Sequence, residues 1–272
     1  MSHPLLSICI PTYNRVNFLK DLLPGLMREI ISADQGNPED VELLISDNAS
    51  TDLTQDYIQS LNSKWVQYHR NEENIGAGRN YFKCIQRATG DYVWLFGDDE
   101  LIIQGGIRKL LQVLRYEKPD LVILDGEDHV PSFYPDYSSC VRDMRIKKRN
   151  RFSLTHTLIT ANVFKIQLFD MPYACRRLGT DYPHMFGFMK KLTQKGTVAV
   201  LGLIMRERQQ RAQFNKWPFA LCVKQGFYLF CLARWTGLRF LYWQAIILCL
   251  NLPVEILSCF LHRFFPGKFG RT

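Results

Sequence analysis

Three adjacent carboxylates, those of Asp98, Asp99 and Glu100, follow an apolar run that ends at Phe96. Adjacent carboxylates repel one another unless a cation neutralises them. Divalent cations such as Mg²⁺ or Mn²⁺ bind carboxylate oxygens and usually share their coordination shell with substrate phosphates. A simpler explanation, in which Asp98 only caps the next helix, stands beside this one. The metal interpretation predicts a divalent cation as cofactor and a phosphate-bearing substrate.

Three further polar clusters follow other apolar runs of the chain. They are Pro-Thr-Tyr-Asn-Arg at residues 11–15, Asp-Asn-Ala-Ser-Thr-Asp at 47–52 and Asn-Ile-Gly-Ala-Gly-Arg-Asn at 74–80. Each cluster by itself is explained by a helix N-cap or a tight turn. Because ligands of α/β proteins bind at the carboxyl ends of parallel strands, four such clusters together predict a single site.

The elements that position these clusters alternate between short apolar runs and segments with helical spacing. Short apolar runs indicate buried parallel strands, and helical spacing indicates helices packed on them. The runs are Leu5–Ile10, Val41–Ile45, Val66–Tyr68, Tyr92–Phe96 and Leu121–Leu124. This alternation predicts a doubly wound α/β fold with a mostly parallel sheet.

The chain after residue 125 is less regular. Residues 126–151 are rich in Pro, Tyr, Ser and Asp and then in Arg and Lys, which predicts a loop over the sheet. Thr197–Met205 predicts one further strand. We expect residues 1–215 to form one domain, with a nucleotide-binding half at 1–125 and an acceptor-side half at 126–215.

Length and charge restrict the class of protein. The chain has 272 residues, of which 47% are hydrophobic, so it can bury a large core and is not a disordered protein. Residues 1–141 carry 12 Lys and Arg against 21 Asp and Glu, whereas residues 142–272 carry 22 against 5. A basic C-terminal half predicts an anionic partner. Nucleic acid is the weakest candidate, because the strand-end clusters lie in the acidic half.

The cysteines and the N-terminus bear on the compartment. The eight cysteines form no Cys-x-x-Cys pair and no zinc-ligand spacing, which is typical of reduced, buried thiols in a reducing compartment. The first residues, Met-Ser-His-Pro, lead directly into an apolar run without a basic segment before it. We therefore expect a cytoplasmic protein.

The C-terminal segment 216–272 has a different composition from the rest. It is dense in Phe, Leu, Trp, Tyr and Cys with isolated basic residues, and 15 uncharged residues separate Arg239 from Glu255. A spanning helix needs about 20 apolar residues. The segment therefore predicts amphipathic helices on an anionic membrane surface, peripheral to the inner face of the cell membrane. A buried helix pair or an oligomer contact is the alternative, and the oligomeric state stays open.

The order of the four clusters resembles that of family 2 glycosyltransferases, which have the GT-A fold. The likeness covers about residues 5–125. It implies a Rossmann-like sheet, a nucleotide diphosphate sugar as donor, a divalent cation and inversion at the sugar. The segment Trp-Leu-Phe-Gly-Asp-Asp-Glu-Leu at residues 94–101 further resembles the abequosyltransferase branch of O-antigen assembly.

The resemblance also implies which residues hold the donor. The set expected at the nucleotide is Pro11, Thr12, Tyr13, Asn14, Arg15, Asp47 and Asn48. The set expected at the nucleotide and pyrophosphate is Asn74, Gly76, Arg79 and Asn80. The family's Asp-x-Asp signature matches Gly97-Asp98-Asp99, so the first Asp is replaced by Gly. Asp99 keeps the metal-ligand position that the resemblance implies. The ribose contact of the missing carboxylate passes to Asp98 or is lost, so the part played by Asp98 stays open.

Family members carry a catalytic base on a second acidic motif that precedes a helix. Here the match is Asp181, in Gly-Thr-Asp-Tyr-Pro-His at residues 179–184. A carboxylate there would deprotonate the acceptor hydroxyl. A helix N-cap, with Pro183 in the first turn, explains the same residue equally well.

Together these features predict transfer of a sugar from a nucleotide diphosphate to a lipid-linked saccharide acceptor, in cell-surface polysaccharide or O-antigen synthesis. A nucleotidyltransferase is one alternative. It would carry a Gly-rich, basic loop directly after the first strand. This chain has Pro-Thr-Tyr-Asn-Arg at residues 11–15 instead, which disfavours that alternative. A non-catalytic, membrane-bound nucleotide-sugar-binding or scaffolding protein on the same fold is the other alternative, suggested by Gly97.

Overall fold

A computed structural model describes most of the first 207 residues and little of the rest. The described ranges are 3–33, 38–63, 65–125, 130–147, 159–179, 183–202 and 204–207, with the isolated residues Cys231, Arg234, Thr236 and Gly237. The chain divides into two compact units, Met1–Gln210 and Arg211–Thr272. Asp181 and nearly all of the predicted amphipathic segment 216–272 lie outside the described residues. Within those ranges, every helix is too short or too polar to cross a bilayer.

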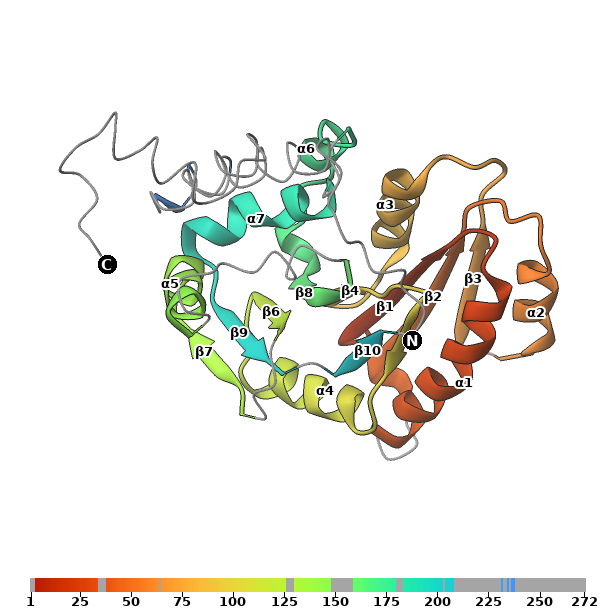
Figure 1. Cartoon of the computed structure of the whole chain (residues 1–272), viewed down its shortest axis with the longest axis horizontal. Coiled ribbons are helices and arrows are strands. Elements are labelled where there is room, and N and C mark those ends of the chain that lie inside the picture. Colours follow the sequence, from red (N-terminus) through yellow and green to blue (C-terminus); the bar gives the residue numbers. More distant parts are fainter. Residues whose placement is uncertain are drawn as a thin grey trace, which may run out of the picture. The chain divides into compact units, whose positions relative to one another are not determined.

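The first unit is built on an eight-stranded sheet with the strand order β3-β2-β1-β4-β8-β6-β9-β7 (Figure 1). The strands are β1 Leu6–Thr12, β2 Val41–Asp47, β3 Val66–Arg70, β4 Tyr92–Leu95, β6 Leu121–Leu124, β7 Ser132–Tyr134, β8 Asn162–Lys165 and β9 Val198–Leu201. Strands β3, β2, β1 and β4 are parallel to one another. Strand β8 is antiparallel to both β4 and β6, so β6 runs in the same direction as β4.

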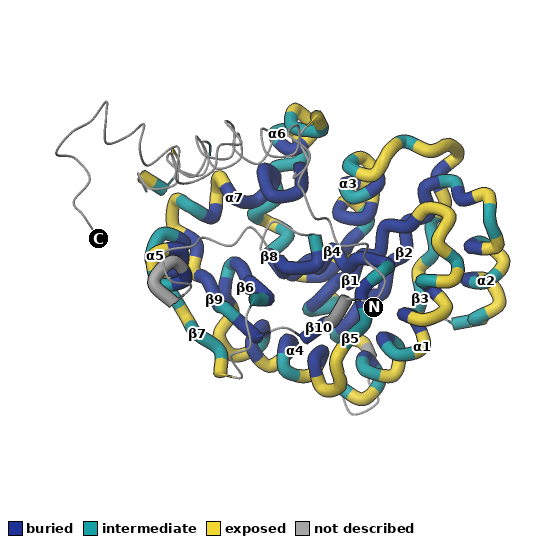
Figure 2. Tube along the Cα trace, in the orientation of Figure 1, coloured by how far each residue is buried: buried dark blue, intermediate teal, exposed yellow. Residues whose placement is uncertain are grey.

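The sheet confirms an α/β fold that is mixed but mostly parallel. All five predicted strands are present, although β1 continues through Pro11 to Thr12, where Thr12 is paired with Asp47. Strand β3 was expected to be buried, but it is the edge strand and its residues are half-buried or exposed. The central strands β1, β2 and β4 are buried along their length (Figure 2).

Helices cover both faces of the sheet. They are α1 Val16–Ala33, α2 Thr54–Ser60, α3 Ala77–Arg87, α4 Gly106–Tyr116, α5 Tyr137–Lys147, α6 Met171–Cys175 and α7 Pro183–Lys195. Ile8 of β1 belongs to the core cluster formed with α1 and α4, whereas Cys9 donates its thiol to the Cys84 carbonyl of α3. Because successive strand residues point to opposite faces, α3 lies on the face opposite α1 and α4.

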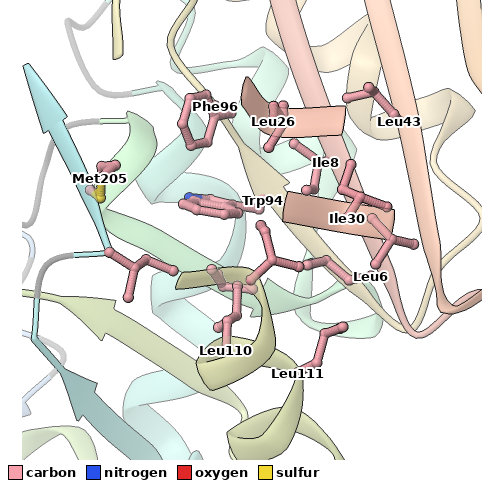
Figure 3. Packing of buried hydrophobic residues seen from close by; sticks show 14 of the residues in the cluster. Leu6, Ile8, Leu26, Ile30, Leu43, Trp94, Phe96, Leu110, Leu111 and Met205 are labelled. Carbon is pink, nitrogen blue, oxygen red and sulfur yellow. The ribbon is translucent and has the colours of Figure 1, made fainter. Parts of the chain in front are cut away.

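The core beneath the site is packed around Trp94 of β4. Its ring lies edge-on to Phe96 with the centroids 4.7 Å apart, and Leu110 of α4 lies nearby (Figure 3). The indole N–H donates to the Thr160 carbonyl at 2.8 Å, so the polar end of this buried side chain is satisfied. Trp94 therefore fixes the strand that leads into the acidic turn.

Two predictions for the chain after residue 125 are wrong. Part of residues 126–151 forms β7 and α5 instead of a loop, because Tyr137, Cys140, Val141 and Met144 make a buried helical face between polar residues. The single strand expected at Thr197–Met205 is two strands, β9 and β10 Met205–Glu207. They lie in different sheets, because β10 pairs with the short strand β5 Glu100–Ile102. The acidic turn thus leads into β5, and the helix α4 follows later.

Candidate functional site

The four polar clusters meet at one edge of the sheet. In the parallel ladders Thr12 of β1 pairs with Asp47 of β2, and Asp47 pairs with Arg70 of β3. On the other side of β1, β4 ends at Leu95, and the acidic turn follows it. The carboxyl ends of four neighbouring strands therefore lie side by side, as predicted.

The acidic turn is neutralised in part by the chain itself. The Nη1 atom of Arg15 lies 2.8 Å from Oδ1 of Asp98 and 3.5 Å from Oδ2 of Asp99. The Thr12 hydroxyl donates to the other Asp98 oxygen at 2.8 Å. Both oxygens of Asp98 are thus engaged, and its side chain is only 8% exposed against 28% for Asp99. Asp99 is the carboxylate that a ligand can reach.

Arg15 and Asp98 shift each other's pKa. Burial raises the pKa of Asp98, although the charge of Arg15 and the Thr12 hydrogen bond act in the opposite direction. Burial lowers the pKa of Arg15, but the charges of Asp98 and Asp99 outweigh it and raise that pKa. Arg15 is therefore a permanent cation at the edge of the site, held in place by Asp98.

Asp47, expected at the nucleotide, is completely buried. It accepts hydrogen bonds from the Tyr68 hydroxyl at 2.6 Å and from the Ser50 N–H at 2.9 Å. Arg70 Nε lies 3.7 Å from the same carboxylate, and its Nη2 donates to the Ser50 carbonyl. Asp47 thus holds Tyr68 and Arg70, two residues that sequence analysis did not single out although Arg70 also ends a strand.

A network of amides joins the strand-end loops. Asn48 donates to the Asn74 side chain at 2.7 Å, and Asn71 donates to the side-chain oxygens of both Asn48 and Asn80. Asn80 also exchanges hydrogen bonds with Ser46, so its amide is used inside the network. A satisfied network of this kind fixes the loops before any ligand binds.

Hydrogen bonds of Asn14 join the loop after β1 to the loop after β2. The Asn14 N–H donates to the Ser50 hydroxyl at 2.9 Å, and the Asn14 side-chain oxygen accepts from the Thr51 N–H at 2.7 Å. Asn14 has a φ of 54°, a conformation that Asn tolerates better than most residues. Next to it, Tyr13 is 41% exposed, whereas Pro11 and Thr12 are buried in β1.

Helix α3 begins at this edge. Gly76 has a φ of 83°, and its N–H donates to the Asn74 side chain at 3.0 Å. The N-terminus of a helix carries a partial positive charge and unpaired N–H groups that favour anions. Arg79 in its first turn is exposed and forms no ion pair with any residue in the described ranges. This end of α3 and Arg79 suit a phosphate.

The turn at Leu178 and the start of helix α7 border the site from the second half of the chain. A Cβ atom at Gly78 would lie 3.0 Å from Cδ2 of Leu178 and 3.3 Å from Cγ of Pro183. The rings of Tyr81 and His184 lie edge to face with centroids 6.2 Å apart. Burial raises the pKa of Tyr81, and the charge of Asp98 raises it further. Described residues on either side of Asp181 therefore pack against α3, although Asp181 itself is not described.

Comparison of the sequence with known protein families shows to which family this chain belongs. Residues 7–196 match the sequence profile described as Glycosyl transferase family 2. The chain belongs to this family. The abequosyltransferase RfbV of Salmonella typhimurium is 31% identical over 213 residues, which are 71% of this chain and 62% of that protein. The chain thus spans less than two thirds of that relative's length.

Other relatives and solved structures agree with a family 2 glycosyltransferase. The GalNAc(5)-diNAcBac-PP-undecaprenol beta-1,3-glucosyltransferase of Campylobacter jejuni is 26% identical over 112 residues, 40% of this chain and 34% of that protein. S. aureus TarS 1-349 in complex with UDP-GlcNAc superposes with a TM-score of 0.61 at 12% identity, covering 97% of this chain and 77% of that chain. The mannosyltransferase PcManGT from Pyrobaculum calidifontis, in complex with GDP-Man and Mn²⁺, gives 0.54 at 14%, covering 98% and 82%. The two structures show the GT-A fold.

The departure from the Asp-x-Asp signature of family 2 glycosyltransferases has a steric counterpart. The Gly97 N–H donates to the Thr160 hydroxyl at 2.9 Å, and a Cβ atom at Gly97 would lie 3.1 Å from that hydroxyl. The same Cβ would lie 3.0 Å from Oδ1 of Asp99. Any side chain at 97 would therefore press on Thr160, in the short helix η3 Ile159–Ala161, and on Asp99.

The donor set restricts how this glycosyltransferase would hold a cation. In the part of the chain that the structure describes, no three His, Cys, Asp or Glu side chains come together as a metal site. With Asp98 engaged, Asp99 is the accessible carboxylate. Such a set fits Mg²⁺ or Mn²⁺, which commonly take one or two protein carboxylates and complete their shell with phosphates and water.

Proposed function

We propose that this chain transfers a sugar from a nucleotide diphosphate to a hydroxyl of a lipid-linked saccharide, with a divalent cation and with inversion at the sugar. One observation carries this proposal: an accessible carboxylate, Asp99, lies beside the cation Arg15 at the edge of the sheet where α3 begins. Anionic and cationic groups converging at the strand ends of an α/β sheet suit a metal-bound diphosphate.

The donor would lie along this edge. Tyr13 is exposed and offers a ring to the base, and the loop fixed by Asn14, Asp47 and Asn48 would surround the nucleoside. Because Asp98 is engaged by Arg15 and Thr12, we assign it to holding Arg15 rather than to direct contact with the ribose. The diphosphate would face Arg79 and the first turn of α3 after Gly76, whereas Asn74 and Asn80 position that turn.

The leaving diphosphate needs its developing charge neutralised. A divalent cation held by Asp99 would supply Lewis-acid stabilisation of that charge when it is bound. Arg15 lies 3.5 Å from the same carboxylate and adds a fixed positive charge. Arg79, exposed in the first turn of α3, adds a second positive charge near the strand ends. These side chains would orient the donor and weaken its bond to the sugar.

The acceptor hydroxyl needs a base. We assign this role to Asp181, because Leu178 and Pro183 on either side of it pack against Gly78 of α3, beside the proposed diphosphate site. A carboxylate within hydrogen-bond reach of the acceptor hydroxyl would take its proton as the new bond forms. The half of the domain at 126–215 would then be the acceptor side, and 1–125 the donor side.

The lipid-linked acceptor is inferred from the relatives and the charge distribution. The name of the C. jejuni relative includes an acceptor linked through PP to undecaprenol. The basic, aromatic-rich segment 216–272 would bind the anionic inner face of the cell membrane and keep the domain at its acceptor. We place the activity in cell-surface polysaccharide or O-antigen synthesis, as the likeness to an abequosyltransferase suggests.

Calorimetry tests the proposal. Nucleoside diphosphates are titrated into the full chain with and without Mn²⁺, and nucleotide sugars are then screened for release of the matching diphosphate. We expect one nucleotide to bind in the presence of the metal and its sugar to be released or transferred. Binding without turnover would favour a scaffolding protein on this fold, and absence of metal-dependent binding would contradict the enzyme proposal.

A further inference from the structure

Helices α6 and α7 gather three cations around one aromatic ring. The guanidinium carbons of Arg176 and Arg177 lie 5.6 Å and 5.3 Å from the ring centroid of Tyr173. Nζ of Lys190, on α7, lies 5.2 Å from the same centroid. Arg177 also lies over the Phe186 ring at 5.7 Å. We call Tyr173, Arg176, Arg177 and Lys190 the Tyr173 cluster.

Two cations of this cluster, Arg176 and Lys190, are exposed at the surface. Neither Arg176 nor Lys190 forms an ion pair with a described residue, and both are exposed. The carboxylate of Asp170 caps α6, because it accepts from the Tyr173 N–H at 2.9 Å. Over residues 159–202 the sequence carries six Lys and Arg against two Asp. Arg176 and Lys190 therefore give this surface two exposed positive charges.

Three like charges this close repel one another. All are within 5.6 Å of one ring, so they lie within roughly one Debye length of each other, about 10 Å at 0.1 M salt. Cation–π attraction to Tyr173 holds them but cancels none of the charge. An anion with more than one negative charge would be attracted by both exposed cations, Arg176 and Lys190. The two guanidinium groups also offer paired N–H donors of the kind that bind phosphate oxygens.

The position of the cluster relates it to the proposed acceptor. His184 of α7 contacts Tyr81 beside the acidic turn, and Lys190 follows it by six residues on the same helix. Six helical residues span about 9 Å. A ligand that reached both places would have a reacting group at the site and an anionic group roughly one or two sugar units away.

We propose that the Tyr173 cluster binds the diphosphate diester that links the saccharide acceptor to its lipid. This inference rests on the lipid-linked acceptor of the proposed function and adds the residues that recognise it. A diphosphate diester carries two negative charges and matches the two exposed cations, Arg176 and Lys190, better than a phospholipid headgroup with one. Arg176 and Lys190 contact the phosphate oxygens, and Arg177, packed on Phe186, completes the positive face.

Vesicle flotation with the full chain tests this site. One set of phosphatidylcholine vesicles contains a polyprenyl diphosphate, and a second contains phosphatidylglycerol at the same total surface charge. The test variant is R176Q/K190Q, and the matched control is K20Q/K83Q, which removes two exposed cations from α1 and α3, one of them Lys20 on the Tyr57 ring. R176K/K190R keeps both charges and reports on folding.

We expect R176Q/K190Q to bind the diphosphate vesicles roughly tenfold more weakly or worse, and the control less than threefold. R176K/K190R should stay close to the unchanged protein. Equal losses for R176Q/K190Q and the control would overturn the proposal. So would an equal loss on both kinds of vesicle, because the cluster would then respond to surface charge in general. The assay contains no donor and no metal, so an inactive enzyme would still give the expected result.

Discussion

The two ends of the central strands both hold carboxylates, but they hold them differently. At the amino end, Glu42 of β2 is buried and accepts hydrogen bonds from the Ser7 hydroxyl at 2.5 Å and the Gln67 amide at 2.9 Å. The N–H and hydroxyl of Thr89 donate to it at 2.9 and 3.1 Å. Neutral donors thus occupy both oxygens.

At the carboxyl end, a single guanidinium lies between two carboxylates. Arg15 approaches Asp98 and Asp99, and 28% of the Asp99 side chain stays exposed. A buried carboxylate whose two oxygens are both occupied by the chain's own donors stabilises the fold and has no capacity for a ligand. A carboxylate with a longer contact and an exposed face can exchange partners. We therefore expect Glu42 to stabilise the fold and Asp99 to bind a ligand.

The largest expected effect is on activity at the carboxyl end. Asp99→Asn should lower sugar transfer by about 10³-fold, because the metal-bound diphosphate loses the carboxylate that we propose holds the cation. Its stability should change by no more than about 0.5 kcal/mol, since the side chain is partly exposed. Release of nucleoside diphosphate and urea unfolding measure the two quantities. Asp56→Asn, an exposed residue of α2, is the control, and a loss below tenfold in the Asp99 variant would contradict the metal assignment.

The opposite result is expected at the amino end. Glu42→Ala leaves the buried hydroxyl of Ser7 and the part-buried donors of Thr89 without their acceptor and should lower the free energy of unfolding by about 3 kcal/mol. Metal-dependent nucleotide binding by the folded protein should be unchanged, as calorimetry below the unfolding transition can show. If Glu42→Ala weakened nucleotide binding while the protein stayed folded, the contrast between the two ends would be wrong.

Much of this arrangement could be predicted from the sequence, for a physical reason. The parallel strands are continuous apolar runs, and the polar clusters follow them directly, so the edge that carries the site could be located. Helix α5 could not, because its buried face of Tyr137, Cys140, Val141 and Met144 is interrupted by polar residues and lies in a stretch that resembles a loop.

The pairings within the site could not be predicted either. Arg15 and Asp98 are 83 positions apart, and Tyr68 and Asp47 are 21 apart, so their contacts depend on strand order and register. Glu42 interrupts an apolar run and gave no signal of its four donors. For the same reason, the sequence does not reveal that Arg15 supplies part of the charge that neutralises the acidic turn.

Two glycines, one at each end of the strands, differ in how closely their surroundings are packed. A Cβ atom at Gly90, at the amino end, would lie 2.8 Å from the backbone nitrogen of Ser7, which cannot move without disturbing β1. Gly90→Ala should therefore cost about 2 kcal/mol of stability. At the carboxyl end, the Cβ of Gly78→Ala would meet the side-chain tip of Leu178 at 3.0 Å, which can move. Its stability should fall by less than about 1 kcal/mol.

Turnover distinguishes the two glycine variants. Gly78→Ala should lower transfer by about tenfold, because the new methyl group changes the packing of Leu178 and Pro183, which flank the proposed base Asp181. Gly90→Ala should keep normal turnover per folded molecule. Gly25→Ala in α1, where no atom lies within 4 Å of the new Cβ, is the control and should gain up to about 1 kcal/mol. A Gly90 variant as stable as this control would show that the amino end is not closely packed.

The smallest expected effect is a difference in pH dependence between two carboxylates of the site edge. Burial would raise the pKa of Asp52, but hydrogen bonds from Thr54 and the Val16 N–H outweigh it and lower that pKa. The stability from Asp52 is then present above about pH 4, the unfolded value, and is lost as the pH falls through the folded pKa. For Asp98, whose pKa is raised by burial, the sign is opposite, and stability is lost as the pH rises above about 4.

Urea unfolding between about pH 3 and pH 7 measures both signs. The stability of the unchanged protein relative to Asp52→Asn should increase with pH, because the charged form of Asp52 accepts hydrogen bonds from both helix starts. Relative to Asp98→Asn it should decrease with pH, because an amide at 98 can still accept from Arg15 without burying a charge. If both stability differences changed with pH in the same direction, Arg15 would compensate the burial of Asp98 fully. The carboxylates of the acidic turn would then be satisfied by the chain itself, as Glu42 is.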